Sequence, residues 1–305
     1  MKSDIVASVN RRRFLLQGAA LASVLAAETG KAKSDRIGIS SWSFHNFFTK
    51  THDKESGPLD KSWDLREFPA MIADRYGVHQ MEMVAPHFES MQPSYIAEVK
   101  ASLARAHSHL VNIPVDIEEL QAGSGLSDPN IKLREGIIAA CVKWIDLGQT
   151  LGAKSVRCDP GKINRADLSP TISAYKKLAS YAGLKDMYVI IENHGGVGSE
   201  HPEDLVKIFQ AAGPHCGALP DMGNFPDEAT RKRGLRLLYP YARTVSHAKG
   251  LKFDAAGKET AFDFPDAIQA SKDAGYNGVF SIEYEGPGDP YVGVQHVVDE
   301  LNRYL

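Results

Sequence analysis

The chain has 305 residues, of which 43% are hydrophobic and 24% charged, as in an ordinary globular protein rather than a disordered or fibrous one. Beyond the N-terminus no apolar stretch of about 18 residues occurs, which argues against a transmembrane span. The three cysteines show no CxxC spacing, so they provide neither a disulfide framework nor a zinc-finger pattern, and we expect all three to be buried.

The N-terminus resembles an export signal. Arg11-Arg12-Arg13-Phe14-Leu15-Leu16 precedes an alanine-rich apolar run that ends in small residues near Ala27. The paired arginines before Phe-Leu resemble a twin-arginine signal in particular. An amphipathic first helix is the alternative, but this run has no polar face. We therefore expect residues 1–33 to be a leader outside the fold and the protein to be exported to the periplasm, without stable membrane insertion after the signal is removed.

The charge of the remaining chain argues against a nucleic-acid partner. Residues 1–27 hold four basic and one acidic residue, so their removal changes the formal net charge from −3 to −6. An acidic protein without long Lys/Arg runs is a poor ligand for a phosphate backbone. The one basic cluster, Arg231-Lys232-Arg233, lies on a predicted helix, and we interpret it as a solvated face.

From Arg36 onward, short apolar runs alternate with longer amphipathic ones. The sixth apolar run contains Pro220, which is unusual inside a strand. The pattern predicts strands over 37–42, 78–84, 109–115, 154–158, 187–191, 218–221, 244–247 and 278–283. It predicts helices over 65–76, 93–106, 131–151, 172–184, 202–212 and 292–304.

This alternation predicts an α/β fold built as a single (β/α)₈ TIM barrel. Strands separated by whole helices must be parallel, and eight such units match the usual size of a closed barrel. An open doubly wound sheet is the runner-up, but no GxGxxG follows the first strand. Since no linker interrupts the chain, we expect residues 34–305 to form one catalytic domain.

Four polar residues stand at the ends of the last four predicted strands. Glu192, Asp221, His247 and Glu283 belong to successive units, and neighbouring strand ends of a barrel meet at one face. Three carboxylates and an imidazole cannot share a partly dry pocket without a compensating positive charge. The pattern therefore predicts one divalent metal ion, with Mn²⁺, Mg²⁺, Co²⁺ and Zn²⁺ all compatible with these ligands.

Each of the four residues also has an ordinary structural interpretation. Glu192 could cap the next helix, and Asp221 could form an Asx-turn before Gly223. His247 could be a core histidine, and Glu283 could pair with a lysine. The metal hypothesis rests on their common position at four consecutive strand ends, not on any one of them.

These residues and their neighbours resemble a known superfamily. The motifs are Ile191-Glu192-Asn193-His194-Gly195, Asp221-Met222-Gly223, His247-Ala248-Lys249 and Ile282-Glu283-Tyr284-Glu285. They are similar to those of the xylose isomerase-like TIM-barrel superfamily, and within it to the sugar phosphate isomerase/epimerase branch. The resemblance spans roughly Arg36 to Leu305. It is specific for the superfamily and poorly specific for a substrate.

The resemblance implies a divalent metal held by Glu192, Asp221, His247 and Glu283. It further implies a small carbohydrate substrate, from which one of the two glutamates removes a proton α to a carbonyl while the other returns it. A metal-stabilised enediolate would connect the two steps. Sugar hydroxyls or the carbonyl would be held by Glu82, Arg157, His194 and Lys249.

Two further positions are candidate substrate contacts. Asn224 stands where related ketose epimerases carry a histidine, and an amide can bind a hydroxyl but cannot transfer a proton at neutral pH. This departure argues against a simple ketose 3-epimerase. His45 follows the first predicted strand at the same face, as either a substrate contact or a loop residue.

Four functions compete at this stage. The first is a sugar isomerase or epimerase, and the second is an exported lyase or hydrolase that uses the same metal and glutamate base on a 3-keto-glycoside. A DNA-repair endonuclease of the same superfamily would need more histidines and a basic groove. A non-enzymatic sugar-binding protein is the fourth. The sequence leaves open the sugar, the metal, and whether the chain forms a homo-oligomer.

Overall fold

The computed structural model describes residues 32–305. The basic and apolar segments of the expected export signal, at 11–27, lie outside the described residues. Lys33 to Leu305 form one compact unit. Among the helices described in this range, none has both the length and the apolar character that crossing a membrane requires.

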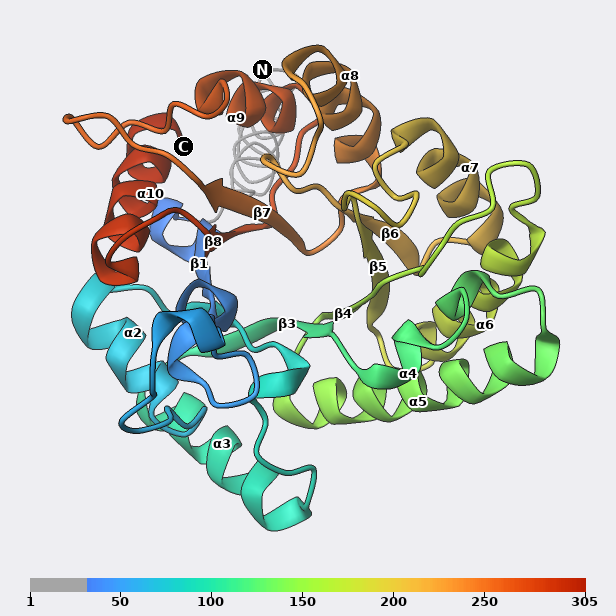
Figure 1. Cartoon of the computed structure of the whole chain (residues 1–305), viewed down its shortest axis with the longest axis horizontal. Helices are drawn as coiled ribbons and strands as arrows, with labels where there is room; N and C mark the ends of the chain where they lie inside the picture. Colours follow the sequence, from blue (N-terminus) through green and yellow to red (C-terminus); the bar gives the residue numbers. More distant parts are fainter. Residues whose placement is uncertain (1–31) are drawn as a thin grey trace, which may run out of the picture. The chain divides into compact units, whose positions relative to one another are not determined.

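The unit is built on a sheet of eight parallel strands. Their order is β6-β5-β4-β3-β2-β1-β8-β7, so strands that are consecutive in the chain are neighbours in the sheet, except for β6 and β7 at its two ends. Figure 1 shows the strands as a ring with the helices outside it. The strands are β1 (Ile37–Ser40), β2 (Gln80–Glu82), β3 (His109–Val115), β4 (Ser155–Cys158), β5 (Tyr188–Glu192), β6 (Cys216–Leu219), β7 (Val245–Gly250) and β8 (Val279–Tyr284).

The ring closes between β6 and β7 by a narrow seam. Asp221 pairs with His247, and Ala218 pairs with Ala242, as isolated parallel bridges. The His247 N–H donates to the Pro220 carbonyl at 2.9 Å, and the Met222 N–H donates to the His247 carbonyl at 3.2 Å. The predicted (β/α)₈ barrel is confirmed, since these bonds join the two ends of the sheet.

Helices cover the outside of the ring. Pro93, Pro202 and Pro290 begin α3, α7 and α10, where the missing N–H removes no helical hydrogen bond. The α-helices are α2 (Phe68–Tyr76), α3 (Pro93–Arg105), α4 (Glu118–Gln121), α5 (Ile131–Leu151), α6 (Ser169–Gly183), α7 (Pro202–Ala212), α8 (Glu228–Leu238), α9 (Phe264–Asp273) and α10 (Pro290–Tyr304). The 3₁₀-helices are η1 (Lys33–Arg36), η2 (Ser41–Phe47), η3 (Lys54–Ser56), η4 (Ala85–His87), η5 (Gly125–Ser127) and η6 (Tyr239–Tyr241).

The sequence predicted most of these elements, with local differences. β3, α5 and α7 have the predicted bounds, whereas no bounds were predicted for α8 and α9. β6 lies two residues earlier than predicted and ends before Pro220, which has no N–H to donate to a neighbouring strand. Arg231 is buried with its guanidinium 4.8 Å from the Phe262 ring centre, so the basic cluster on α8 is not simply a solvated face.

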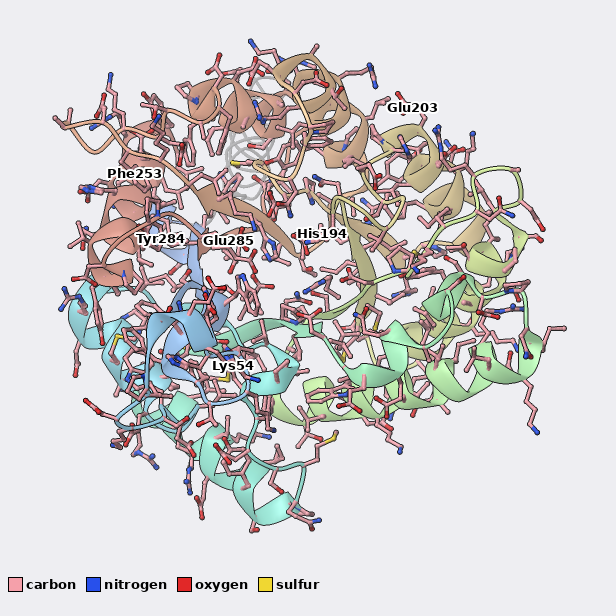
Figure 2. The ribbon with its side chains drawn as sticks, viewed as in Figure 1. Lys54, His194, Glu203, Phe253, Tyr284 and Glu285 are labelled. Atoms are coloured by element: carbon pink, nitrogen blue, oxygen red, sulfur yellow. The ribbon has the colours of Figure 1, made fainter. Side chains whose placement is uncertain are left out.

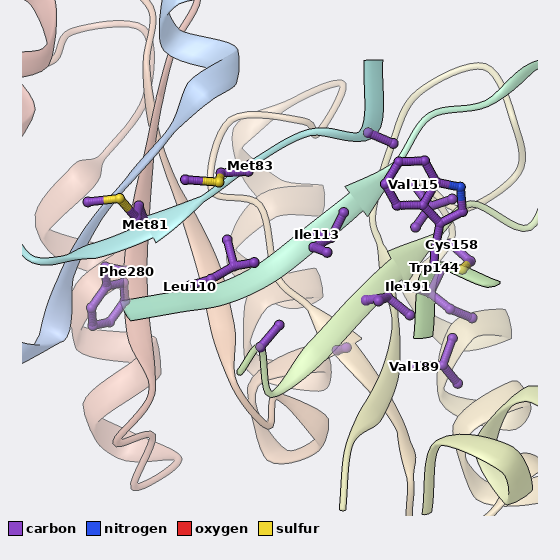
Figure 3. Packing of buried hydrophobic residues seen from close by; sticks show 14 of the residues in the cluster. Met81, Met83, Leu110, Ile113, Val115, Trp144, Cys158, Val189, Ile191 and Phe280 are labelled. Carbon is purple, nitrogen blue, oxygen red and sulfur yellow. The ribbon is translucent and has the colours of Figure 1, made fainter. Parts of the chain in front are cut away.

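Alternate residues of the strands face two different cores. On β5, Val189 and Ile191 belong to the core between sheet and helices, while Ile190 belongs to a separate cluster inside the ring. Figure 3 shows part of the outer core around β3 and β5. The inner cluster consists of Val111, Ile190, Leu219, Val245 and Val279. Since side chains alternate, Glu192 follows Ile190 on the inner side, above this apolar layer. All three cysteines are buried, as expected.

A buried histidine fixes the segment that follows β1. The His87 ring stacks on Phe48 with 3.7 Å between ring centres. Its Nδ1 lies 2.9 Å from the Ser41 hydroxyl, and its Nε2 lies 2.9 Å from the Thr51 hydroxyl. Because the Thr51 hydroxyl donates to the His45 carbonyl, it accepts from Nε2–H, so the neutral ring uses one donor and one acceptor.

This environment predicts acid-sensitive stability. Burial, with the neighbouring His45 and Lys50 charges, lowers the pKa of His87 from 6.5 to about 3. Between pH 6.5 and pH 3, His87 is protonated in the unfolded chain but stays neutral in the folded protein. The free energy of unfolding therefore decreases by about 1.4 kcal/mol for each unit by which the pH is lowered in this range. In urea unfolding at pH 7 and pH 5, we expect His87→Gln to lose less stability on acidification than the natural protein. Equal losses would contradict this assignment.

Candidate metal centre

The structure brings the four predicted ligands together at one end of the barrel. Glu192 ends β5, Asp221 follows β6, His247 lies in β7 and Glu283 lies in β8. All four side chains are buried. One ligand atom from each lies within 4.8 Å of all the others. These four donor atoms are therefore close enough together to hold one metal ion.

The carboxylate oxygens gather around one nitrogen of the imidazole. His247 Nδ1 lies 3.0 Å from Glu192 Oε1, 3.2 Å from Glu283 Oε2 and 3.4 Å from Asp221 Oδ2. The Lys249 ammonium lies 2.8 Å from Glu283 Oε2 and 3.1 Å from Asp221 Oδ2. Each ligand residue therefore directs a donor atom toward the same small volume.

Asp221 shows that these residues fit a metal ion. Its Oδ1 accepts the N–H groups of Gly223 and Asn224, at 2.7 and 2.9 Å, so the Asx-turn considered above does form. Its Oδ2 is buried and forms no hydrogen bond among the described residues, although the Lys249 ammonium is near. A buried carboxylate oxygen without a donor is costly, and a cation would satisfy it. Three carboxylates and one imidazole suit a divalent ion.

The charges in the cluster shift one another. Burial raises the pKa of Glu192, with the His247 and Arg157 charges opposing it. Burial also opposes ionisation of Glu283, but the His247 and Lys249 charges outweigh it and lower the pKa. Although burial disfavours the His247 cation, the surrounding glutamates raise its pKa well above the usual value. A metal ion needs the neutral imidazole, so its binding must displace that proton.

Glu82, which was predicted to contact a substrate, does not line the pocket above the cluster and lies behind the imidazole of His247. The residue is fully buried, and its Oε2 lies 3.1 Å from His247 Nε2. Its Oε1 accepts from Asn112 Nδ2 at 2.7 Å, and the Asn112 oxygen accepts from the Ser155 hydroxyl at 2.8 Å. The register of β2 and β3 shifts between Met81 and Glu82, which brings Glu82 opposite Asn112. Carboxylates in this position fix the ring orientation of metal-binding histidines.

Asp221 is fixed from both sides. Asn193, directly after β5, donates to the Asp221 carbonyl at 3.0 Å and accepts the Asp221 N–H at 2.8 Å. Gly223 leaves room for the neighbouring lysine, because a Cβ at this position would lie 2.6 Å from Lys249 Cγ. The short motif after β6 therefore holds the ligand and admits the lysine to the cluster.

A cavity of about 330 Å³ opens above the cluster, and we call it the metal pocket. Glu192 and Glu283 line it, whereas Asp221 and His247 are not among its lining residues. Figure 2 places His194 and Glu285 toward the inside of the ring of strands. The lining residues are Trp42, Val84, Asp116, Gln121, Arg157, Asp159, Glu192, His194, Val197, Lys249, Glu283 and Glu285.

Arg157 lines the metal pocket as predicted, but its guanidinium is already paired. Its Nη1 lies 2.5 Å from Asp159 Oδ2, and its Nη2 lies 2.9 Å from Asp116 Oδ2. Its Nε lies 3.5 Å from Glu192 Oε2. Asp159 and Asp116 therefore hold the two Nη groups, while the buried Nε forms no hydrogen bond among the described residues.

The other predicted substrate contacts divide into two groups. His194 and Lys249 line the metal pocket. Asn224 does not line it, and its amide donates instead to Glu192 Oε1 at 3.0 Å. His45 lines a neighbouring cavity, because η2 turns the chain away directly after β1.

Several residues of the metal pocket were not among the predicted contacts, and three of them line it as polar or aromatic groups near the cluster: Asp159, Glu285 and Trp42. Asp159 directly follows β4, so the strand-end rule applied above could have found it. Glu285 follows Glu283 by two residues and therefore continues the same side of the strand. Trp42 lies in η2, where the sequence predicted the end of a strand, and no signal in the sequence marks its position.

Comparison with known proteins agrees with this arrangement. Residues 71–303 match the family described as xylose isomerase-like TIM barrel. The chain belongs to this family. A similar solved structure is that of L-ribulose 3-epimerase, with a TM-score of 0.67, 13% identity, and coverage of 88% of this chain and 96% of that one. A family protein from Mycobacterium smegmatis in complex with magnesium gives a TM-score of 0.64 at 18% identity, with 92% and 99% covered. At such low sequence identities, the similarity to these two structures shows only that the folds are alike.

One curated relative is also similar in sequence. It is named inosose dehydratase, from Glaesserella parasuis serovar 5 (strain SH0165), and it is 23% identical over 190 residues. The match covers 56% of this chain and 61% of the relative. The chain thus spans about three fifths of the length of that protein.

Because the buried Oδ2 of Asp221 accepts no hydrogen bond from the described part of the chain, we predict that a bound metal ion stabilises the fold. We expect Mn²⁺ at a hundred times its dissociation constant to stabilise the natural protein by about 2.7 kcal/mol. Asp221→Asn keeps the turn-forming oxygen but turns an N–H₂ toward the ion, so the gain should disappear. Thermal unfolding with Mn²⁺ and with EDTA measures this, and Glu203→Gln on the exposed side of α7 is the control. An equal gain in Asp221→Asn would exclude the site.

The position of Glu82 predicts a weaker site when its charge is removed. Glu82→Gln places an N–H₂ group against either His247 Nε2–H or the Asn112 amide, so the ring loses its orientation. We expect the Mn²⁺ affinity to fall roughly ten- to a hundredfold. Titration calorimetry measures the affinity, and Glu300→Gln, which alters a buried carboxylate paired with Arg303, is the matched control. Unchanged affinity would show that Glu82 does not act through the imidazole.

Proposed function

We propose that the protein is a divalent-metal-dependent sugar isomerase or epimerase that removes a proton from a carbon α to a carbonyl. One observation carries the proposal. Of the four candidate ligands, only the two glutamates line the metal pocket, while Asp221 and His247 do not. The two groups that can accept and return a proton are thus the ones that face a substrate. The family and its epimerase neighbours support the same reaction type.

Each of these residues has its own role in the proposed reaction. One glutamate takes the proton from the α-carbon, and the electron pair moves to the carbonyl oxygen. The other glutamate returns a proton to the opposite face of the same carbon for an epimer. For an isomer it returns the proton to the former carbonyl carbon, and the hydroxyl proton of the α-carbon passes to the former carbonyl oxygen as the new carbonyl forms. A divalent ion, when bound by Glu192, Asp221, His247 and Glu283, supplies Lewis-acid stabilisation of the developing negative charge. Lys249 and His194 line the pocket and would hold hydroxyl groups.

The charge of the metal pocket favours a neutral substrate. Its lining holds the carboxylates Asp116, Asp159, Glu192, Glu283 and Glu285. Only Arg157 and Lys249 oppose them among the lining residues, and both are paired with protein carboxylates. Even with a divalent ion bound, these groups sum to a negative charge. A sugar phosphate would be repelled, whereas an uncharged sugar would not be.

An elimination reaction is the second candidate, and two observations favour it. Asn224 binds Glu192 and carries no group that could transfer a proton at neutral pH. The curated relative is named a dehydratase, and a dehydratase eliminates water. On a 3-keto-glycoside, the same α-proton abstraction would expel the oxygen substituent at C1, which leaves with a proton. The sequence at 11–27 supports export, which we propose for either reaction.

Proton abstraction predicts exchange with solvent. We expect the Mn²⁺-loaded protein in D₂O to introduce deuterium next to the carbonyl of its sugar substrate. Glu192→Gln and Glu283→Gln should each slow the exchange roughly a hundred- to ten-thousandfold, because neither amide accepts the proton. Mass spectrometry of a panel of ketoses and 3-keto-glycosides measures both the exchange and the product.

The products separate the two reactions. An epimer or isomer of a free ketose identifies the first, and an unsaturated ketone from a 3-keto-glycoside identifies the second. Glu203→Gln is again the control, and metal analysis of each variant separates loss of the base from loss of the ion. Full exchange in both glutamate variants with metal bound would refute the proposed chemistry.

A further inference from the structure

A second cavity adjoins the metal pocket. It has a volume of about 470 Å³ and lies between η2 and the segment that follows β8, and we call it the aromatic pocket. Four aromatic residues belong to its lining, of which Trp42 and Phe47 are partly exposed, whereas Phe44 and Tyr284 are buried. The remaining lining residues are Ser43, His45, Asn46, Glu285, Gly286, Gly288 and Pro290.

The two pockets share a rim made by two side chains. Trp42 and Glu285 line both cavities, and the Trp42 indole N–H donates to Glu285 Oε1 at 2.7 Å. The same carboxylate oxygen lies 3.2 Å from the Lys249 ammonium beside the candidate ligands. A chain of contacts thus connects the metal cluster to the wall of the aromatic pocket. Figure 2 shows Glu285 and Tyr284 close together at the end of β8.

The chemistry of the two linings differs sharply. The metal pocket has five carboxylates and two cations, whereas the aromatic pocket has the partly exposed Trp42 and Phe47, and Glu285 as its one carboxylate. Aromatic faces bind the apolar faces of rings, and a few polar groups fix their orientation. The volume suffices for a ring, since a cavity of about 150 Å³ already holds benzene.

The lining is also held in place before any ligand binds. Trp42 stacks on His45 with 4.9 Å between ring centres, and Phe47 stacks on Trp63 at 5.0 Å. The hydroxyl of Ser43, another lining residue, donates to the Ile282 carbonyl and accepts the Tyr284 N–H, which joins η2 to β8. A wall fixed in this way loses little side-chain freedom when a ligand binds.

We infer that the aromatic pocket is a second substrate subsite, which binds a six-membered ring joined through a glycosidic oxygen to the sugar in the metal pocket. The substrate that fills both pockets is then a glycoside, and a free ketose would leave the aromatic pocket empty. The inference rests on the proposed function for the position of the reacting sugar. Because C1 of a glycoside carries no free carbonyl, the reacting carbonyl must be elsewhere on the ring, as in an oxidised glycoside.

Matched pairs of glycosides test the subsite. The Mn²⁺-loaded protein is titrated with methyl and phenyl β-glycosides of several hexoses and their 3-keto forms, and with cellobiose, in a calorimeter. Burial of a phenyl ring stabilises binding by about 1.5–3 kcal/mol, so we expect the phenyl glycoside to bind roughly ten- to a hundredfold more tightly than its methyl partner. Cellobiose distinguishes a sugar ring from a phenyl ring as the preferred occupant.

Two variants at Phe47 test whether the aromatic pocket causes the preference for the phenyl glycoside. Phe47→Ala removes one ring of the lining, and Phe47→Leu keeps most of its packing against Trp63 if the alanine variant folds poorly. Both should reduce the phenyl-to-methyl ratio toward one. Phe253→Ala is the matched control, because Phe253 is also partly buried but lines a separate cavity beyond Tyr284. Figure 2 labels Phe253 and Tyr284.

The outcomes separate the subsite from the proposed function. A ratio near one in the natural protein, or an equal ratio in Phe47→Leu, overturns the subsite even where deuterium exchange is found. A phenyl preference that Phe47→Leu abolishes and Phe253→Ala retains supports the subsite, even where no metal-dependent exchange occurs and the proposed function fails.

Discussion

The crowding of carboxylates around one buried imidazole is the constraint on which this structure depends. Glu82, Glu192, Asp221 and Glu283 all lie within 3.4 Å of a nitrogen of His247. Buried like charges at such separations are tolerated only with compensating cations. His247 and Lys249 provide part of this compensation, and the free oxygen of Asp221 leaves a place for a metal ion. The site is therefore arranged for a cation that the protein itself does not fully supply.

The same residues close the barrel. The seam between β6 and β7 consists of few hydrogen bonds, and the backbone of His247 takes part in two of them. Two hydrogen bonds from Asn193 then join the end of β5 to Asp221, which follows the neighbouring strand β6. The geometry of the candidate ligands thus depends on closure of the ring, so the site cannot form before the last strands are in place.

The two cavities give the molecule a division of chemistry. Charged groups, five of them carboxylates, line the metal pocket, while aromatic residues line the cavity beside it. The rim of Trp42 and Glu285 belongs to both. A substrate with one hydroxyl-rich ring and a second ring matches this arrangement better than a small phosphorylated sugar does, because each part then meets a surface of its own kind.

The sequence by itself determined the alternation of strands and helices, and with it the positions of Glu192, Asp221, His247 and Glu283 at strand ends. These follow from local periodicity, since a strand end and the two-residue alternation of side chains can be read from a short segment. Which side chains the site residues contact was decided only by the tertiary structure. Glu82 lies behind the imidazole because a register shift turns it toward Asn112. His45 faces another cavity because η2 turns the chain, since such contacts depend on packing between segments far apart in the sequence.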